Sequence, residues 1–347
     1  MATRRARGAK RKAPPQQTML ALLTGHWIAQ MLFAVVKLGV PDALAKGALA
    51  PDAIATRLGA NPAYLRRVLR ALASVGVFSE DARGRFELTP LGQTLRSGRP
   101  GSLRDFALMI VEKYNYRSWE RLTDALVQGG TAFELEFGQP IFEYLRAHPD
   151  DDRQFSASMA SISATENEAV ARAYPFRRHA RLVDVGGAHG HLLATILRRY
   201  KKLRGVLYDQ PQVVASAPAS GFVTALGVRE RCEVVGGSFF DGVPAGADAY
   251  LMKYIIHDWD DAKCARILGH CRDAMAPGGR VLVVDRVIAP GNGPDWSKWL
   301  DINMLVGPGG QERTRSEFAA LFEGAGLALV AVHETQSPLS VLEAARR

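Results

Sequence analysis

Helical patterns dominate the first part of the chain. Apolar residues recur at three-and-four spacing over residues 65–75, which is typical of an amphipathic helix. Asn61 and Pro62 stand at its start, where an N-cap and a first-turn proline are favoured. Short β patterns at residues 77–79 and 85–88 flank a polar turn and predict a hairpin. Three short helices followed by a hairpin predict a winged helix.

Residues 103–172 are again helical in pattern and carry many bulky side chains. We expect these side chains in a core or an interface first, and in the wall of a substrate pocket second. They are Phe106, Met109, Tyr116, Trp119, Phe133, Phe137, Phe142, Phe155 and Met159.

Near Arg181 the pattern changes to strands that alternate with helices. Five apolar runs, several of them separated by amphipathic helices, predict a parallel, doubly wound sheet. Two final runs, 327–333 and 340–344, have no helix between them and are expected to pair antiparallel at one edge. The predicted fold class is α/β, with a Rossmann-like seven-stranded domain after a mainly α winged-helix domain. The five runs are 181–185, 205–209, 232–235, 249–252 and 280–285.

Length and composition agree with two globular domains. The chain has 347 residues, of which 47% are hydrophobic and 23% charged, and this excludes fibrous, disulfide-scaffold and wholly disordered proteins. We expect a basic disordered tail over residues 1–18, a helical domain over 19–172 and a second domain over 173–347.

The net charge of +9 is concentrated at the amino terminus. Six of the 44 basic residues lie within the first twelve positions, and without them 38 basic residues face 35 acidic ones, a balance of +3. Such a run is typical of a solvated terminus, with contact to nucleic acid or an anionic surface as the alternative. The six are Arg4, Arg5, Arg7, Lys10, Arg11 and Lys12.

Cysteine use and apolar runs indicate a cytoplasmic protein. The three cysteines, Cys232, Cys264 and Cys271, suggest a reducing compartment, and the last two fall on an apolar helical stripe without a zinc-binding spacing. The longest obvious apolar run, residues 31–36, is too short to span a bilayer or to form a secretory signal core. No membrane partner is expected.

A glycine-rich turn follows the first predicted strand of the second half. Residues 184–190 read Asp-Val-Gly-Gly-Ala-His-Gly, and His191 stands where a dinucleotide fingerprint needs glycine. Asp209 ends the second strand 23 residues after Gly186, the distance at which a carboxylate meets ribose hydroxyls. Adenosine without pyrophosphate favours S-adenosylmethionine over NAD. The simpler alternatives are a tight turn and a surface aspartate.

Several spaced motifs resemble one known family. In order and spacing they are similar to class I small-molecule O-methyltransferases, the caffeate, isoflavone and hydroxyindole group and its bacterial secondary-metabolite relatives. The resemblance spans residues 19–345. The motifs are 184–190, Tyr208-Asp209-Gln210-Pro211, Gly236-Gly237-Ser238-Phe239-Phe240, Lys253 to Trp259, Pro277-Gly278-Gly279 and Gly309 to Thr314.

This resemblance implies a cofactor site for S-adenosylmethionine, which reacts to S-adenosylhomocysteine (SAH). No metal site is expected, because no third His or Cys lies near His189 and His191. Gly186 would face the methionine part, Asp209 the ribose, and Lys253 the cofactor from the end of the fourth strand. Ser238 stands where the family normally has aspartate and Ala188 where it often has glycine, so we expect altered affinity rather than a lost site. The implied cofactor residues are Asp184, Gly186, Gly187, Asp209, Gln210, Ser238, Phe239 and Lys253.

The same resemblance makes His257 the general base. A phenol near pKa 10 and a histidine near 6.5 leave the proton transfer uphill by roughly 5 kcal/mol unless the site changes the balance. Two acids stand in matching positions, Glu312 and Asp285. The family more often has glutamate where Asp285 stands, so we expect Glu312 to be the principal orienting partner and Asp285 the secondary one.

Other positions are assigned more generally. Asp258 and Asp260 are expected as cap and first-turn acids of the next helix, Arg313 as structural, and His189 and His191 as solvent or helix-start residues. Residues 306–310 suit a lid or a static turn. Candidate substrate-binding residues by resemblance are Trp119, Phe155, Met159, Asp258, Asn303 and Met304.

The resemblance further implies a homodimer formed through the first domain and a small aromatic substrate. Its main prediction is O-methylation of an aromatic hydroxyl. The alternatives are N- or C-methylation, non-methylating chemistry with the same cofactor, and a winged-helix DNA-binding regulator. Nucleic acid is the weakest of these, because apolar residues occupy much of the would-be recognition helix.

Overall fold

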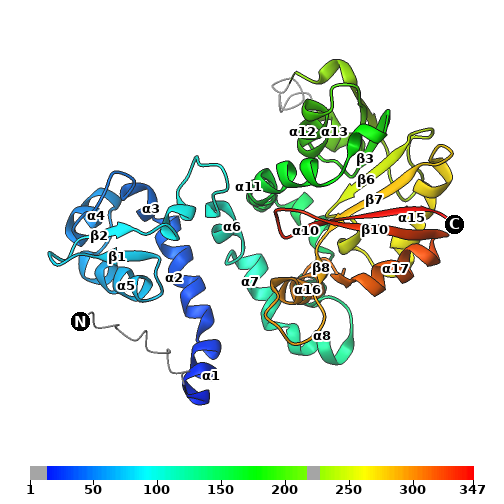
Figure 1. Ribbon diagram of the computed structural model, residues 1–347. Helices are drawn as coiled ribbons and strands as arrows, with labels where there is room; N and C mark the ends of the chain where they lie inside the picture. Colours follow the sequence, from blue (N-terminus) through cyan, green and yellow to red (C-terminus); the bar gives the residue numbers. More distant parts are fainter. Residues whose placement is uncertain (1–13, 217–226) are drawn as a thin grey trace, which may run out of the picture. The chain divides into compact units, whose positions relative to one another are not determined.

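The computed structural model describes residues 14–216 and 227–347 and contains two compact units, Met1–Glu112 and Lys113–Arg347 (Figure 1). Most of the expected tail, residues 1–13, lies outside the described residues, while Pro15–Leu23 forms helix α1. The expected boundary at residue 172 differs from this division. Residues 113–172 belong to the second unit, because the long helix α11 (Pro149–Ala173) packs against α12 (His191–Arg199) of the sheet domain.

The first unit consists of short helices around one hairpin. Its buried core includes Ile54, Leu69, Leu72 and Phe86. The predicted helices and hairpin are present. The elements after α1 are α2 (Gly25–Lys37), α3 (Val40–Ala43), α4 (Pro51–Leu58), α5 (Pro62–Ser74), β1 (Phe78–Glu80), β2 (Phe86–Leu88), the 3₁₀ helix η1 (Gly92–Leu95) and α6 (Arg104–Met109).

Helix α5 shows why the local pattern was informative. The Asn61 side chain accepts a hydrogen bond from the Tyr64 backbone N–H at 3.2 Å, as an N-cap does. Leu65 and Leu69 are buried, whereas Val75, at the end of the apolar spacing, is 42% exposed. The apolar stripe therefore ends one turn earlier than the sequence pattern suggests.

Helices also open the second unit. They are α7 (Lys113–Glu120), α8 (Leu122–Gln128), α9 (Ala132–Phe137), α10 (Ile141–Ala147) and α11, followed by the 3₁₀ helix η2 (Phe176–Arg178). Phe133 is buried, but Trp119 and Phe142 are each 37% exposed, so the bulky residues of this segment do not all enter a core.

A seven-stranded mixed sheet forms the centre of the second unit, and this confirms the predicted fold class. Its order is β10-β11-β7-β6-β3-β4-β5. Strands β5, β4, β3, β6 and β7 are parallel, and β11 pairs antiparallel with both β7 and β10. The strands are β3 (Arg181–Val185), β4 (Arg204–Asp209), β5 (Cys232–Gly236), β6 (Ala249–Lys253), β7 (Arg280–Asp285), β10 (Leu327–Glu334) and β11 (Ser340–Arg346).

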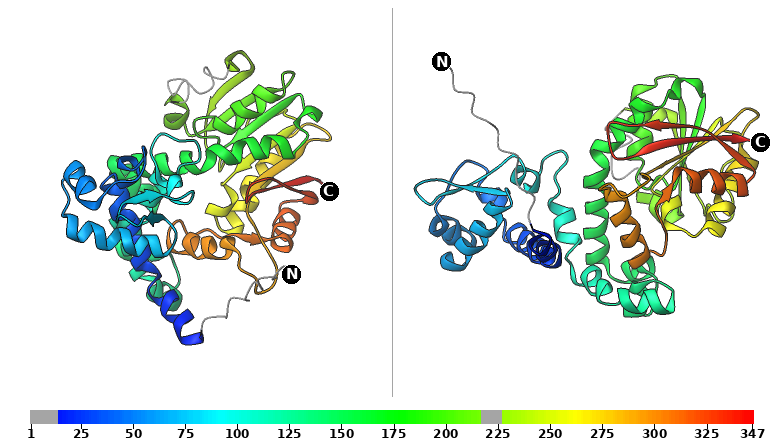
Figure 2. Two further views of the ribbon diagram at one scale, coloured as in Figure 1. Left: turned by 60° about the vertical axis from the view of Figure 1, so that its left-hand side comes forward. Right: turned by 60° about the horizontal axis from the view of Figure 1, so that its bottom comes forward.

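Helices cover both faces of this sheet, as Figures 1 and 2 show. Leu182 and Leu207 point to the face packed by α11, α12 and α13 (Pro211–Ser216). Val183 points to the opposite face, packed by α15 (Asp261–Ala274) and α17 (Arg315–Gly324). Both Cys264 and Cys271 are fully buried on α15, which confirms their prediction as small core residues.

The remaining elements lie in the connections. They are the 3₁₀ helices η3 (Arg229–Arg231) and η4 (Ile256–Asp258), the two-residue strands β8 (Val287–Ile288) and β9 (Arg313–Thr314), which pair with each other, and helix α16 (Trp296–Val306). Loops after β3, β4, β6 and β7 meet at one edge, because these neighbouring parallel strands are in register: Val185 pairs with Tyr208 and Lys253 with Val284. Open α/β sheets bind ligands at this carboxyl edge.

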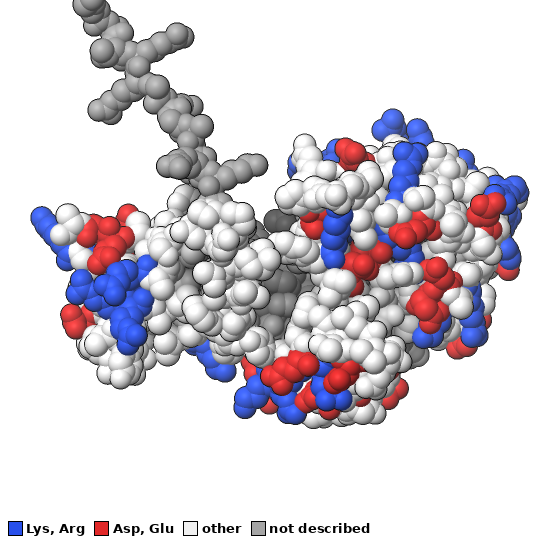
Figure 3. Space-filling view, turned by 90° about the horizontal axis from the view of Figure 1, so that it is seen from below, with Lys and Arg blue, Asp and Glu red and all other residues white. Residues whose placement is uncertain are grey.

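Two further observations concern the distribution of surface charge and the hydropathy of the helices. On the face drawn in Figure 3, basic and acidic side chains are interspersed on each unit and form no continuous basic stripe there. In the described part of the chain, no single helix is long and apolar enough to cross a membrane, although α1 and α2, bent by 43° at their break, pass that test as a pair.

Candidate active site

A tight turn follows β3 at the carboxyl edge. Gly186 and Gly190 adopt the left-handed backbone conformation, with φ of 70° and 78°. A Cβ at Gly186 would lie 2.3 Å from the Cδ1 atom of Ile255, and one at Gly187 would lie 2.8 Å from the carboxyl group of Asp184. Close packing thus restricts both Gly186 and Gly187, and the left-handed backbone of Gly186 also favours glycine there.

Ala188 also adopts a left-handed conformation, with φ of 47°. Compared with glycine, alanine adds only a methyl group, and the larger cost is conformational, about 1 kcal/mol for an L-residue in this region. The turn holds the conformation with a hydrogen bond of 2.8 Å from the Ala188 backbone N–H to Oδ2 of Asp209.

Asp184 and Asp209 bring two carboxyl groups to this turn. Asp184 is buried, and its Oδ2 atom has no hydrogen-bond partner among the described residues. Burial, with a smaller contribution from Asp209, raises the pKa of Asp184 to about 7. Asp209 accepts a second backbone hydrogen bond, from Gln210 at 2.7 Å, and burial raises its pKa as well.

Lys253 ends β6 beside these acids. Its Nζ atom donates a hydrogen bond of 2.9 Å to Oδ1 of Asn167 and lies 3.2 Å from Oε2 of Glu166. The Lys253 side chain is only 8% exposed. Burial lowers its pKa, and the Glu166 carboxylate opposes that effect. A buried ammonium paired with a single carboxylate is therefore available at the cofactor side of the edge.

Phe239 completes this side. Its ring lies 3.7 Å from the position of a Cβ on Gly186, so the structure brings these two predicted cofactor residues together. Ser238 accepts a hydrogen bond of 3.2 Å from the Phe240 backbone N–H. Gln210 immediately precedes α13, and its carbonyl accepts hydrogen bonds from the Val213 and Val214 N–H groups.

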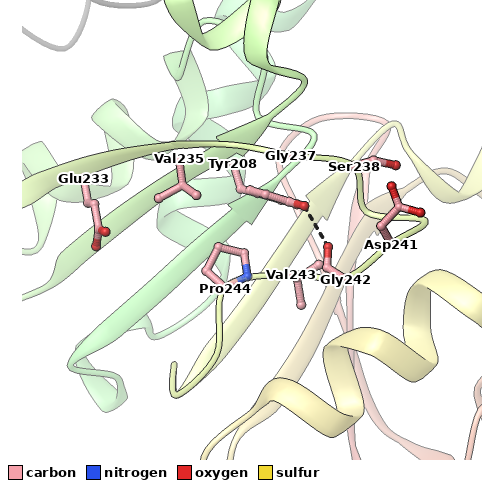
Figure 4. Close-up of a pocket in the computed structure, with 9 residues that line it drawn as sticks. All are labelled: Tyr208, Glu233, Val235, Gly237, Ser238, Asp241, Gly242, Val243 and Pro244. Atoms are coloured by element: carbon pink, nitrogen blue, oxygen red, sulfur yellow. Dashed lines mark hydrogen bonds between the residues drawn. The ribbon is translucent and has the colours of Figure 1, made fainter.

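Figure 4 shows a shallow hollow next to this region. Tyr208 donates a hydrogen bond of 2.8 Å to the Gly242 carbonyl across it. Of the predicted cofactor residues only Ser238 lines the hollow, which extends along β5 toward Glu233 instead of over the glycine turn. Apart from Ser238, the predicted cofactor residues at the carboxyl edge therefore do not line the hollow.

His257 lies in η4, four residues after the end of β6, and is buried. Its Nδ1 atom is 2.8 Å from Oε1 of Glu312, whose side chain is fully buried. The Glu312 backbone N–H in turn donates to Oδ1 of Asp301 at 2.9 Å. Because a carboxylate only accepts, this contact places a proton on Nδ1 and leaves Nε2 as the atom that can take another.

Two further acids surround the imidazole. Oδ1 of Asp258 lies 3.4 Å from Nε2 of His257, and Asp285 is fully buried at the end of β7. Burial by itself lowers the pKa of His257, but the carboxyl groups of Asp258, Glu312 and Asp285 outweigh it and raise this pKa to about 10. Burial raises the pKa of Asp285 to about 8 and that of Asp258 to about 6.

The loop before α17 is packed tightly against His257. A Cβ at Gly310 would lie 1.8 Å from the His257 carbonyl oxygen, which accepts a hydrogen bond of 2.8 Å from the Gln311 N–H. Arg313, 1% exposed, donates to the carbonyls of Ile256 and Trp259 and to the Asp261 carboxylate. Of the two interpretations for residues 306–310, these contacts favour the static turn.

One expectation about the next helix is wrong. Asp260 is the N-cap of α15 and accepts from the Lys263 N–H at 2.8 Å, while Asp261 is the first-turn acid. Asp258 takes neither position, because η4 ends there and holds its carboxyl group beside His257. The Asp258 carboxyl group therefore lies beside the His257 imidazole and does not cap the helix.

The predicted substrate wall is spread over three helices. Trp119 lies on α7, Phe155 and Met159 on α11, and Asn303 and Met304 on α16. Phe155 packs edge-to-face with Phe142 at 6.4 Å between ring centres. Met304 is nearly buried. The assignment of these residues to an acceptor pocket stays a prediction.

Sequence reasoning missed three residues at the site. Glu166 and Asn167 contact Lys253, and Tyr254 packs its ring on the His257 imidazole at 5.1 Å between centres. Tyr254 lies within the motif from Lys253 to Trp259, so the sequence did contain a signal for it. The Glu-Asn-Glu run of α11 offered none, because it looks like a solvated helix face.

Within residues 14–216 and 227–347, no group of three or more His, Cys, Asp or Glu is arranged to hold a metal ion. The fold and the edge together define a Rossmann-like enzyme with a glycine turn on one side and a buried His–Glu pair on the other. Residues 119–328 match the family model of the O-methyltransferase domain, and residues 20–98 match that of the O-methyltransferase dimerisation domain. The chain belongs to the O-methyltransferase family.

Relatives of known activity cover nearly the whole chain. Phenazine O-methyltransferase PhzM of Lysobacter antibioticus is 42% identical over 331 residues, 95% of this chain and 96% of that protein. The 8-amino-8-demethylriboflavin N,N-dimethyltransferase of Streptomyces davaonensis is 35% identical, with 91% of each chain covered. The crystal structure of CalO1, a methyltransferase in calicheamicin biosynthesis, in its SAH-bound form is similar with a TM-score of 0.86 and 36% identity, over 96% of this chain and all of that one.

Proposed function

We propose that this protein transfers a methyl group from S-adenosylmethionine to a hydroxyl group of an aromatic small molecule, with His257 as general base. The observation that carries the proposal is the buried contact of 2.8 Å between Nδ1 of His257 and Glu312 at the carboxyl edge of the sheet. The family membership and the names of its relatives support methyl transfer to small aromatic acceptors.

The residues of the turn fit the cofactor. The orphaned Oδ2 atom of buried Asp184 and the carboxylate of Asp209 offer acceptors beside a turn of left-handed backbone. Lys253 and Phe239 border the same turn. These residues would hold the methionine and adenosine parts. When bound, S-adenosylmethionine supplies an electrophilic methyl group on a sulfonium.

The residues around His257 then hold and move one proton. Glu312 fixes the tautomer with hydrogen on Nδ1, so Nε2 accepts the acceptor's hydroxyl proton as the oxygen attacks the methyl group. Asp258, 3.4 Å from Nε2, stabilises the imidazolium that forms. Burial of His257 keeps bulk water away from the proton transfer.

The energetics favour a phenolic acceptor. With a pKa of about 10, His257 matches an ordinary phenol near pKa 10, and the roughly 5 kcal/mol mismatch calculated for an unperturbed histidine disappears. The same pKa leaves most of His257 protonated at pH 7. We therefore expect the methylation rate to rise with pH until His257 is neutral.

A His257→Asn variant tests the base. We expect the methylation rate of a phenolic acceptor, followed by mass spectrometry of the methylated product, to fall by about 10²–10⁴. SAH affinity, measured by calorimetry, should change by less than about twofold, because His257 makes its contacts on the other side of the edge. A variant that methylates at the wild-type rate would contradict the base assignment.

Methylation at nitrogen is the second candidate, because one relative is named as an N,N-dimethyltransferase. An amine acceptor does not need the same base when its nitrogen lone pair is free to attack. We therefore expect phenols, not anilines of the same skeleton, to be methylated in a matched panel. Preference for the anilines with undiminished turnover in His257→Asn would establish the nitrogen alternative.

We further propose that the protein is a homodimer formed through the first unit, as the dimerisation model match suggests. Leu20, Leu22 and Leu23 of α1 and Trp27 of α2 are each at least 60% exposed in the single chain. Exposed apolar patches of this kind mark association surfaces.

Light scattering after size-exclusion chromatography tests the dimer. The double variant Leu22→Glu/Leu23→Glu should elute as a monomer with unchanged circular dichroism, because both side chains are exposed in the single chain. The matched control is Val330→Glu, which alters a residue of β10 that is 55% exposed and should leave the dimer intact. A monomeric wild-type protein would contradict the proposal.

A further inference from the structure

Glu166 of α11 contacts two residues of the loop after β6. Its Oε1 atom accepts a hydrogen bond of 2.8 Å from the Tyr254 hydroxyl, and its Oε2 atom lies 3.2 Å from Nζ of Lys253. The Glu166 side chain is only 5% exposed. A buried carboxylate with two partners on one loop fixes the position of that loop relative to the helix.

Tyr254 is held in an unfavourable backbone conformation. Its φ is +57°, and L-residues other than glycine rarely adopt this region. Such strain persists only where surrounding contacts determine it. Here the contacts are the hydrogen bond to Glu166 and the packing of the Tyr254 ring on His257, at 5.1 Å between centres and 26° between planes.

The positive charge of Lys253 is unfavourable for a cationic donor, and the Glu166 carboxylate offsets it. A buried ammonium repels a sulfonium at the same edge, and His257 adds a second positive charge when protonated. Oε2 of Glu166 supplies the buried negative charge at 3.2 Å from Nζ, while Asn167 supplies a neutral acceptor at 2.9 Å. Removing that charge leaves Lys253 with only a dipole as its partner on α11.

We propose that Glu166 is a positioning residue whose carboxylate neutralises Lys253 for a cationic methyl donor and fixes the Tyr254 ring against the base. This inference rests on the proposed function, since it assigns the cofactor side to Lys253 and the base to His257. It makes α11 the element that links the two sides of the reaction centre. It also implies that the affinity of the site for a ligand depends on the charge of that ligand.

The charge role is tested by comparing two ligands in one variant. S-adenosylmethionine carries one positive charge more than SAH, so Glu166→Gln should weaken binding of S-adenosylmethionine about tenfold more than binding of SAH, a ratio measured by calorimetry without turnover. The matched control is Glu168→Gln on the same helix, whose carboxylate pairs with Arg172 and Arg198 and is 39% exposed. This control should leave both affinities unchanged.

A second variant restores the charge without restoring the geometry. In Glu166→Gln/Asn167→Asp, a carboxylate returns beside Nζ of Lys253, where the Asn167 oxygen now lies at 2.9 Å. The ratio of the two affinities should return to within about twofold of the wild-type ratio. Equal losses for both ligands in Glu166→Gln, or no rescue by the double variant, would overturn the charge role even if both proteins keep their melting temperature.

The ring role has its own readout. Tyr254→Phe keeps the ring and the Glu166–Lys253 pair but removes the hydroxyl, so kcat should fall about fivefold to tenfold while both cofactor affinities stay unchanged. An unchanged kcat would overturn the positioning of Tyr254. If Lys253→Met binds both ligands as tightly as the wild type, the cofactor role proposed for Lys253 is wrong. This result distinguishes a failure of the proposed cofactor site from a failure of the positioning role proposed for Glu166.

Discussion

Two histidine–glutamate clusters, each with a buried glutamate, stand at different places in the same sheet. His257 and Glu312 lie at the carboxyl edge, whereas Glu343 of β11 pairs in register with Leu282, toward the amino end of β7. Glu343 accepts from His333 at 3.0 Å, from Arg280 at 3.1 Å and from the Tyr174 hydroxyl at 3.3 Å.

The clusters differ in how completely their acids are partnered. Glu343 has basic or hydroxyl partners on both oxygens, and despite burial the contacts with His333, Tyr174 and Arg280 lower its pKa. Around His257 three carboxyl groups share one imidazole, and within the described residues both oxygens of Asp285 and one of Glu312 have no hydrogen-bond partner. A saturated cluster stabilises the fold, whereas an incompletely partnered one is typical of a reaction centre.

Of the variants that replace an acid of either cluster, Glu312→Gln should give the largest effect. The amide still accepts from Nδ1 of His257 but no longer stabilises the imidazolium, so the methylation rate should fall about 10²–10³, or about 3–4 kcal/mol in activation free energy. The pH at which the rate levels off should also fall, because the Glu312 contact helps to raise the His257 pKa. A pH–rate profile measures both effects.

The melting temperature is the control for this variant. Near pH 10, where His257 is no longer fully protonated, the variant should lose less than about 1 kcal/mol of folding free energy, and more at pH 7 because Glu312 helps to raise the His257 pKa. If the Glu312→Gln protein were destabilised but kept wild-type activity, the His257 cluster would be structural, which contradicts the comparison between the two clusters.

Glu343→Gln should give the next largest effect, and on stability instead of rate. Its amide cannot accept from all the donors that the carboxylate serves, so unfolding free energy in urea should decrease by about 2–4 kcal/mol. At temperatures well below unfolding, kcat should stay within about twofold of the wild-type value. A catalytic defect in the fully folded variant would show that this cluster is not purely structural.

The smallest expected effect is a difference in pH dependence. The pKa of His257 is raised to about 10 in the folded protein, so its stabilising contribution is complete below about pH 6.5 and is lost as pH rises toward 10. The raised pKa of Asp285 acts in the same direction between about pH 4 and 8. The lowered pKa of Glu343 has the opposite sign, and its contribution is lost in acid.

Thermal melts from about pH 3 to pH 10 measure this difference. His257→Asn should lose less stability than the wild type between pH 7 and 10, by about 2 kcal/mol, and Glu343→Gln should show the wild-type loss over that range. Parallel curves for the wild type and His257→Asn would contradict the assignment of the alkaline decline to His257.

Local patterns predicted most of the fold. The five parallel strands and the Asn61 cap depend on apolar runs and on hydrogen bonds within a few residues, and such signals are readable along a chain. The unit boundary was not readable, because the place of α11 depends on its packing against α12. The cap role expected for Asp258 was wrong because a helix cap and an acid that contacts a histidine look alike in an Asp-rich run.

The sequence by itself determined the sheet, the glycine turn and the identity of the residues that end its strands, since each depends on local propensity and spacing. Only the tertiary structure decided that Asp258 lies beside the imidazole, that Ala188 and Tyr254 take left-handed conformations, and that Glu166 reaches Lys253 from 87 positions away. Pairings at such separations follow from how helices pack on a sheet, and one chain carries no local signal for them.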